Sequence, residues 1–134
     1  MKKFENFKNN LAVLKEAGNQ DLQNEFVKGG VINKFFLQFE RSWKVLKELL
    51  MYEGISEASS GSPREIIKSA FKIYDFIDED IWLSMLNKRN SSSHVYDKKA
   101  ANNLIDKIIS EYIPTFIDLE ERLEERYKDV IGTI

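Results

Sequence analysis

The sequence predicts an all-α protein, an up-and-down bundle of four to five helices. Apolar residues recur at three- and four-residue intervals over long stretches, and no segment shows the alternation of a strand. Only six glycines and two prolines occur in 134 residues, which favours long elements over many short ones. The length suits one compact domain. We therefore expect residues 1–134 to form a single helical-bundle domain.

The first two predicted helices cover about residues 3–17 and 31–53. Glycine is common just beyond a helix, so Gly18 suits the end of the first and Gly54 the end of the second. The Gly29-Gly30 pair is expected to separate the second helix from a short helical segment before it. The second helix has the widest apolar face and is expected to be central. That face consists of Ile32, Phe35, Phe36, Phe39, Trp43, Leu46, Leu49 and Leu50.

The third predicted helix covers about residues 63–75, and its start has a specific signal. Ser62 is followed by Pro63, and Glu65 lies three residues after the serine. This spacing combines a capping box with proline at the first helical position.

The last two predicted helices cover about residues 79–89 and 97–127. Asn90 and the serines after it favour a break between them, because their short side chains compete for backbone hydrogen bonds. Asp97 suits the N-cap of the final helix. Pro114 lies inside that helix and removes one hydrogen bond, so we expect a kink there rather than an end.

Composition excludes several classes of protein. The absence of cysteine removes disulfides, thiolate metal sites and a cysteine nucleophile, and it favours a cytoplasmic location. There is neither a signal-like start nor an apolar run of membrane-spanning length, so we expect no membrane association. The net charge of −2 gives no general attraction to nucleic acid. We also expect no metal or cofactor, and no nucleotidyl transfer by the chain itself, because phosphate-loop, EF-hand and carboxylate motifs are missing.

The segment between the fourth and final helices contains the residues best suited to chemistry. His94 is the only histidine of the chain, with Arg89 before it and Tyr96 after it. On an unbroken helix the side chains of Arg89 and His94 would point about 140° apart. A break over residues 90–93 would allow them to meet, so cooperation between them requires that break.

An imidazole beside a guanidinium suits RNA cleavage by the strand's own 2′-hydroxyl group. His94 can move a proton near neutral pH, and Arg89 can bind the charge that develops on phosphorus, without a metal ion. One imidazole does not conveniently serve both sides of one phosphorus atom, so a symmetric dimer would supply the second. Taken alone, His94 fits a helix cap, Arg89 a helix-end charge and Tyr96 a half-buried anchor.

The order arginine, four residues, histidine, one residue, tyrosine from Arg89 to Tyr96 resembles the signature of HEPN proteins paired with minimal nucleotidyltransferases. Residues 30–54 and 62–65 also resemble the family usually labelled nucleotidyltransferase substrate-binding protein. The likeness covers most of the chain. It implies a HEPN-like helical-bundle homodimer, of toxin–antitoxin type, that associates with a minimal nucleotidyltransferase encoded nearby.

The resemblance implies two alternative roles for the segment. In the first, the chain is a ribonuclease toxin with Arg89 and His94 as its catalytic pair, supported by Asn90 and Ser93 in the loop. Tyr96 would then be the acceptor of AMP, which silences the toxin by charge and volume beside the basic pair. In the second, the bundle is a non-catalytic substrate-binding subunit of the nucleotidyltransferase. A purely structural bundle is a third reading.

Overall fold

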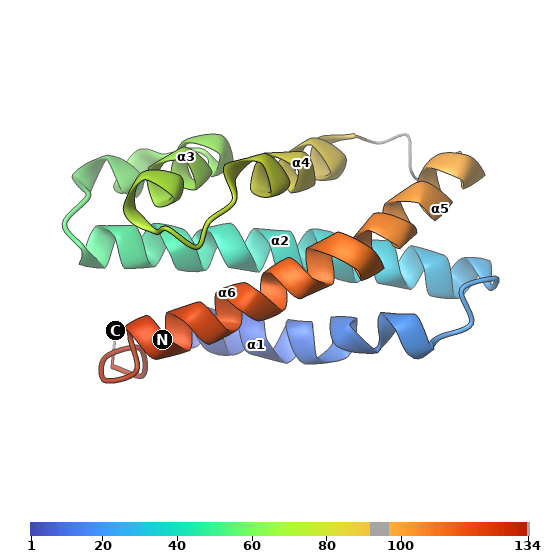
Figure 1. Ribbon diagram of the computed structural model, residues 1–134, viewed down its shortest axis with the longest axis horizontal. Helices are drawn as coiled ribbons and strands as arrows, with labels where there is room; N and C mark the ends of the chain where they lie inside the picture. The colour runs from blue at the N-terminus through green and yellow to red at the C-terminus, as the bar shows by residue number, and fades with distance from the viewer. Residues whose placement is uncertain (92–96, 134) are drawn as a thin grey trace.

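A computed structural model describes residues 1–91 and 97–133, and within these ranges helices are the regular secondary structure. Its α-helices are α1 (Lys2–Leu14), α2 (Glu25–Tyr52), α3 (Pro63–Ile73), α4 (Glu79–Asn90), α5 (Lys98–Lys107) and α6 (Ile113–Arg126). Helix α2 runs the length of the molecule, with α1 antiparallel on one side and α3 and α4 on the other (Figure 1). Helices α5 and α6 cross this layer diagonally. The predicted all-α bundle is confirmed.

Helix α2 corrects one expectation from the sequence. It begins at Glu25 rather than near residue 31, and Asn24 caps it by accepting hydrogen bonds from two backbone N–H groups. Gly29 and Gly30 lie inside this helix, so the predicted interruption at this pair was wrong. Each glycine costs a helix interior about 1 kcal/mol relative to alanine. The long buried face of α2 outweighs that cost, because most helical stability in proteins comes from packing.

The other helix boundaries lie close to their predicted positions. Ser62 accepts a hydrogen bond from the Glu65 backbone N–H at 3.3 Å, as a capping box requires. Gly54 follows α2 with a φ of +86°, a conformation that glycine adopts without steric cost. Asp78 and Asp97 cap α4 and α5 through their carboxylates. Together with Asn24 at the start of α2, short polar side chains thus determine where four of the helices begin.

The final helix passes Pro114 without ending, as predicted. Residues Ile108–Tyr112 form a π-helical segment between α5 and α6, and Pro114 follows it in the first turn of α6. Proline lacks a backbone N–H, and a wider turn just before it accommodates the interrupted hydrogen-bond pattern. The irregularity therefore lies in the five residues that lead into the proline.

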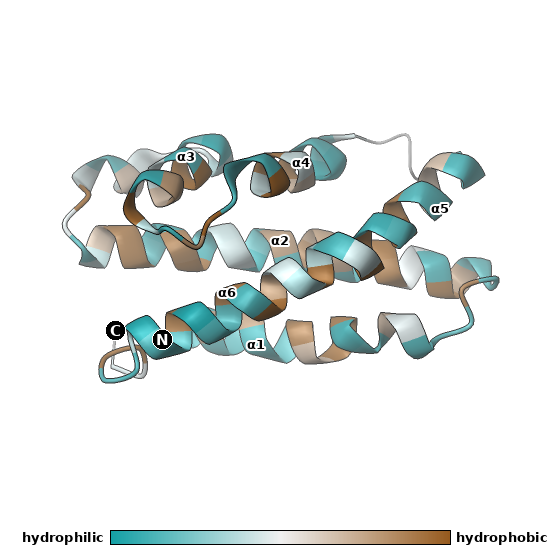
Figure 2. Ribbon diagram, viewed as in Figure 1, coloured by the Kyte–Doolittle hydropathy of each residue, from teal (hydrophilic) through white to brown (hydrophobic). Residues whose placement is uncertain are grey.

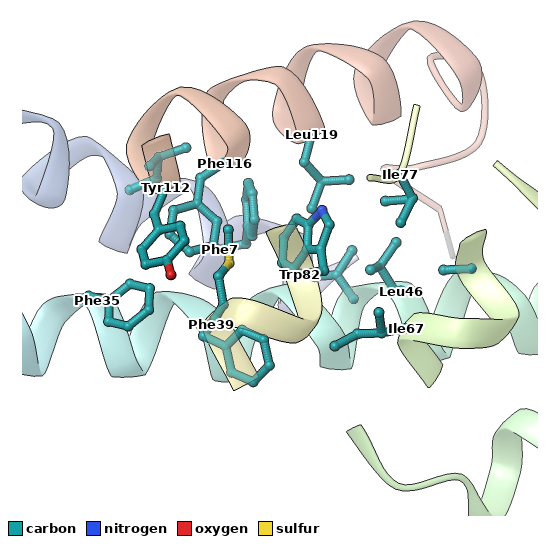
Figure 3. Close-up of a cluster of buried hydrophobic side chains, with 14 of the residues drawn as sticks. Phe7, Phe35, Phe39, Leu46, Ile67, Ile77, Trp82, Tyr112, Phe116 and Leu119 are labelled. Atoms are coloured by element: carbon teal, nitrogen blue, oxygen red, sulfur yellow. The ribbon is translucent and has the colours of Figure 1, made fainter. Parts of the chain in front are cut away.

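Aromatic side chains form the centre of the core. Trp82 of α4 is 1% exposed, and its ring centroid lies 5.7 Å from that of Phe116 and 6.4 Å from that of Phe39 (Figure 3). Phe35 stacks on Tyr112 at 5.1 Å. These contacts join α2, α4 and α6. In Figure 2 the residues of α6 are mostly hydrophilic, whereas those of α2 are more mixed. Among the described residues, no helix has the length and apolar character needed to cross a membrane.

A chain of hydrogen bonds joins the ends of α2, α3 and α6. The Tyr127 hydroxyl donates to Glu53 Oε1 at 2.8 Å and lies 2.6 Å from the Tyr74 hydroxyl. Because the Tyr127 hydroxyl donates its proton to Glu53, Tyr74 donates to Tyr127. Burial raises the pKa of Tyr127, and its hydrogen bonds to Tyr74 and Glu53 add to that rise. Burial likewise raises the pKa of Tyr74.

These two pKa shifts predict a loss of stability in alkali. A tyrosine whose pKa is higher in the folded state stabilises the fold fully below its unfolded pKa of about 10, and that contribution falls as the pH rises further. Tyr127→Phe should make the free energy of unfolding decrease less steeply as the pH rises. At neutral pH it should also lower the free energy of unfolding by about 1–3 kcal/mol, because Glu53 and Tyr74 lose a hydrogen-bond partner. Urea unfolding of both proteins between pH 8 and 11 measures the two effects. The same pH slope in both proteins would contradict the assignment.

Candidate functional site

Arg89 lies in the last turn of α4, at the end that leads into the segment with the predicted site residues. Its guanidinium forms an ion pair with Glu40 of α2 through Nη2, and its Nη1 donates to Asn90 Oδ1 at 3.3 Å. The side chain of Arg89 is 34% exposed and that of Glu40 23%. The guanidinium is thus held against the central helix while part of it remains open to solvent.

Glu40 is itself fixed by two neighbours on α2. Its Oε2 accepts a hydrogen bond from Trp43 Nε1 at 3.1 Å, and Lys44 Nζ lies 4.0 Å from the same oxygen. Oε1 faces Arg89. Because Trp43 and Lys44 hold Oε2, the carboxylate restricts the orientation of the guanidinium more than a freely rotating glutamate would. Glu40 is therefore a positioning residue for Arg89.

The connection from α4 to α5 is anchored on α2 at both ends. Arg89 binds Glu40 before the connection, and Lys98 Nζ binds Glu25 Oε1 at 3.1 Å after it. Asn90 is the last residue of α4, and Ser91 is extended, with φ −90° and ψ 128°. Helix α4 thus ends one residue after the predicted residue 89, and Ser91 lies within the expected break over residues 90–93.

The remaining predicted site residues lie outside the described part of the chain. These residues are Ser93, His94 and Tyr96. The structure therefore places Arg89 and Asn90 and leaves the predicted pairing of Arg89 with His94 as a prediction. Within the described ranges, no group of three or more His, Cys, Asp or Glu side chains is arranged to hold a metal ion.

The described residues define what this end of the bundle can do chemically. A guanidinium has five N–H donors, and Glu40 and Asn90 occupy two of them. The other donors suit bidentate binding of a phosphate or carboxylate. A fixed, partly exposed arginine can therefore orient an anionic group beside the segment that follows α4.

Glu40 is the site residue that sequence reasoning missed. It appeared as one of several charged residues off the apolar face of the second predicted helix, 49 positions before Arg89. Nothing in a helical repeat distinguishes a glutamate that faces solvent from one that faces another helix. The contact of Glu40 with Arg89 can be identified only from the structure, in which α2 and α4 pack together.

The fold and this site define an all-helical bundle protein in which an ion pair fixes an arginine at the end of a helix. The chain belongs to the family described as nucleotidyltransferase substrate binding protein like, whose model matches residues 2–125. This match confirms the expected membership of the nucleotidyltransferase substrate-binding family. No curated protein matches the chain in a sequence search.

Proposed function

We propose that this chain is the partner subunit of a minimal nucleotidyltransferase and that it cleaves RNA without a metal ion. In this proposal Arg89 and His94 form the active site, and AMP on Tyr96 silences it. The observation that carries the proposal is the ion pair of Arg89 with Glu40, which fixes a guanidinium directly before the segment with His94. The family description supports the nucleotidyltransferase as a partner.

The reaction uses the 2′-hydroxyl of RNA as the nucleophile. His94 takes the proton of this hydroxyl, the 2′-oxygen bonds to the adjacent phosphorus, and the bond from phosphorus to the 5′-oxygen breaks. A proton from a second His94, in another copy of the chain, goes to the leaving 5′-oxygen. The products are a 2′,3′-cyclic phosphate and a 5′-hydroxyl. Arg89 stabilises the negative charge of the pentacoordinate phosphorus.

The ribonuclease proposal is tested with purified full-length protein and RNA in the presence of a chelator. Wild-type protein is expected to cleave, and a double variant with Arg89→Ala and His94→Ala, purified identically, is expected not to. The double variant also controls for contaminating nucleases. Equal cleavage by both proteins, or none by either, would overturn the proposal. Size measurement in solution should show a dimer, because the mechanism needs two copies of His94.

Silencing of the toxin depends on a covalent change at Tyr96. The Tyr96 oxygen attacks the α-phosphorus of ATP on the nucleotidyltransferase, pyrophosphate leaves, and the hydroxyl proton passes to solvent. The product carries a negative phosphodiester and a nucleoside close to Arg89, which would exclude RNA by charge and volume.

Coexpression with the neighbouring nucleotidyltransferase, followed by mass spectrometry, tests this modification. Wild-type protein should gain the mass of one AMP and lose ribonuclease activity, whereas Tyr96→Phe should gain no mass and stay active. An AMP adduct that maps to another residue would refute the assignment of Tyr96.

A second candidate function is a substrate-binding subunit without catalysis, and the family description favours it. In that case Arg89 would hold an anionic group of the substrate for the nucleotidyltransferase. This alternative predicts a stable complex with the nucleotidyltransferase and no RNA cleavage by wild-type protein. The ribonuclease test therefore separates the two functions.

A further inference from the structure

A polar cavity of about 230 Å³ lies between α1 and α2. Helices α1 and α4 are on opposite sides of α2, so this cavity is separate from the Arg89 site (Figure 1). The residues that line it are Asn6, Asn9, Asn10, Val13, Lys34 and Arg41. The described lining thus combines two cations with three side-chain amides and contains no carboxylate. Such a lining complements an anion.

A buried hydrogen-bond network fixes the floor of this cavity. Asn10 Nδ2 donates to the Lys34 carbonyl oxygen at 3.1 Å and to Gln38 Oε1 at 2.8 Å. Gln38 Nε2 in turn donates to the Phe7 carbonyl oxygen at 3.2 Å. Asn10 is 6% exposed and Gln38 fully buried. Because these bonds join α1 to α2 through both side chains, the cavity is preformed.

Arg41 has unused hydrogen-bonding capacity in this cavity. Its Nε is buried and has no acceptor among the described residues, and neither Arg41 nor Lys34 forms an ion pair within them. The guanidinium of Arg41, which lines the cavity, carries four further N–H donors that can bind an acceptor from outside the chain. Lys34 and Arg41 are seven residues apart on α2, on one face and about 10 Å apart along the helix. Both can therefore act on one oxyanion group.

An apolar groove of about 550 Å³ adjoins the polar cavity. Val13 and Lys34 line both, so the two spaces are adjacent. Most of the remaining groove is aliphatic, with Leu14, Val27 and Val31 among its lining residues. A ligand that occupies both spaces would need an anionic end and a less polar end. Its size would be that of a small organic phosphate rather than a bare ion.

We propose that the cavity and the groove together bind a nucleoside monophosphate. The phosphate accepts hydrogen bonds from Arg41 and Lys34, and the nucleoside lies in the apolar groove. Glu16 and Gln20 line the groove as well and offer polar groups to the edge of the base. Charge complementarity selects the phosphate, because the described lining of the polar cavity contains cations without carboxylates. This site does not depend on the proposed ribonuclease activity.

Calorimetric titration of the full chain with AMP, adenosine, inorganic phosphate and a short 5′-hydroxyl oligoribonucleotide tests the proposal. AMP should bind most tightly, because it alone fills both spaces. Arg41→Gln should weaken AMP binding by about tenfold or more, since a charge-assisted hydrogen bond is lost. Arg64→Gln is the matched control, because Arg64 is exposed on α3 and lines neither space, and it should bind AMP as wild type does.

Asn9→Asp gives a second variant, at an exposed residue rather than at the partly buried Arg41. Asn9 is exposed at the cavity rim, and a carboxylate there should repel phosphate and weaken AMP binding. His94→Ala should bind AMP normally, which separates this site from the ribonuclease site. Four results would overturn the proposal: no AMP binding by wild type, unchanged binding by folded Arg41→Gln, equal affinity for adenosine and AMP, or tighter Arg41-dependent binding of the oligoribonucleotide.

Discussion

Replacing His94 with alanine is expected to slow RNA cleavage by about 100- to 10,000-fold, the usual contribution of a general acid or base. His94 is the only histidine of the chain. No other imidazole of the chain can therefore transfer protons in the proposed mechanism. Because a symmetric dimer would supply both proton-transfer groups from His94, one substitution removes base and acid together. Initial rates of cleavage of a defined RNA by wild-type protein and by His94→Ala, both measured in the presence of a chelator, give the size of this reduction.

Arg89→Lys separates the shape of the guanidinium from its charge. Lysine retains the positive charge but loses the fork that binds Glu40 and a phosphate oxygen together. Cleavage should fall while binding of RNA is reduced less, because charge alone still attracts the phosphate. Arg64→Lys is the control, because Arg64 is exposed on a different helix and should leave the rate unchanged. A wild-type rate in either folded His94→Ala or Arg89→Lys would contradict the assigned roles.

Trp82→Ala is expected to destabilise the fold by about 3–5 kcal/mol, the cost of truncating a buried aromatic residue to alanine. Trp82 is 1% exposed and contacts Phe39 and Phe116, so its removal leaves a cavity where α2, α4 and α6 meet. Such a loss is a large part of the stability of a small domain. Urea unfolding followed by circular dichroism measures the change.

Phe26→Ala provides the matched comparison for Trp82→Ala. Phe26 is an aromatic residue of α2 but is 92% exposed, so its truncation should change the free energy of unfolding by less than about 0.5 kcal/mol. Similar destabilisation by both substitutions would show that Trp82 is not central to the core. The core also positions Arg89, because Trp82 lies on the same helix. Trp82→Ala should therefore lose the proposed ribonuclease activity at a lower temperature than wild-type protein does.

The fold was largely predictable because its signals are local. The capping box at Ser62 and Glu65 and the cap at Asp97 act within a few residues, so the chain itself specifies these helix starts. The start of α2 was mispredicted at Gly29 and Gly30, since the unfavourable local propensity of glycine is overridden by burial along the rest of α2.

The candidate site was predictable only in part. The spacing of Arg89, His94 and Tyr96 is a property of the sequence, and so is the helix-breaking tendency of the residues between them. The family match confirms the resemblance to the nucleotidyltransferase substrate-binding family, whereas the roles of the three residues remain predictions. Contacts between side chains of different helices, by contrast, produce no periodic pattern in a single sequence, so they cannot be predicted from it.

The sequence by itself determined the all-α class, most helix boundaries, the helix break within residues 90–93 and the family, because each depends on local propensity or residue order. The tertiary structure alone decided that Glu40 holds Arg89. It also decided that Lys34 and Arg41 share a cavity with amides from α1. Both arrangements join residues far apart in the chain, and packing of helices against α2 brings them within contact distance.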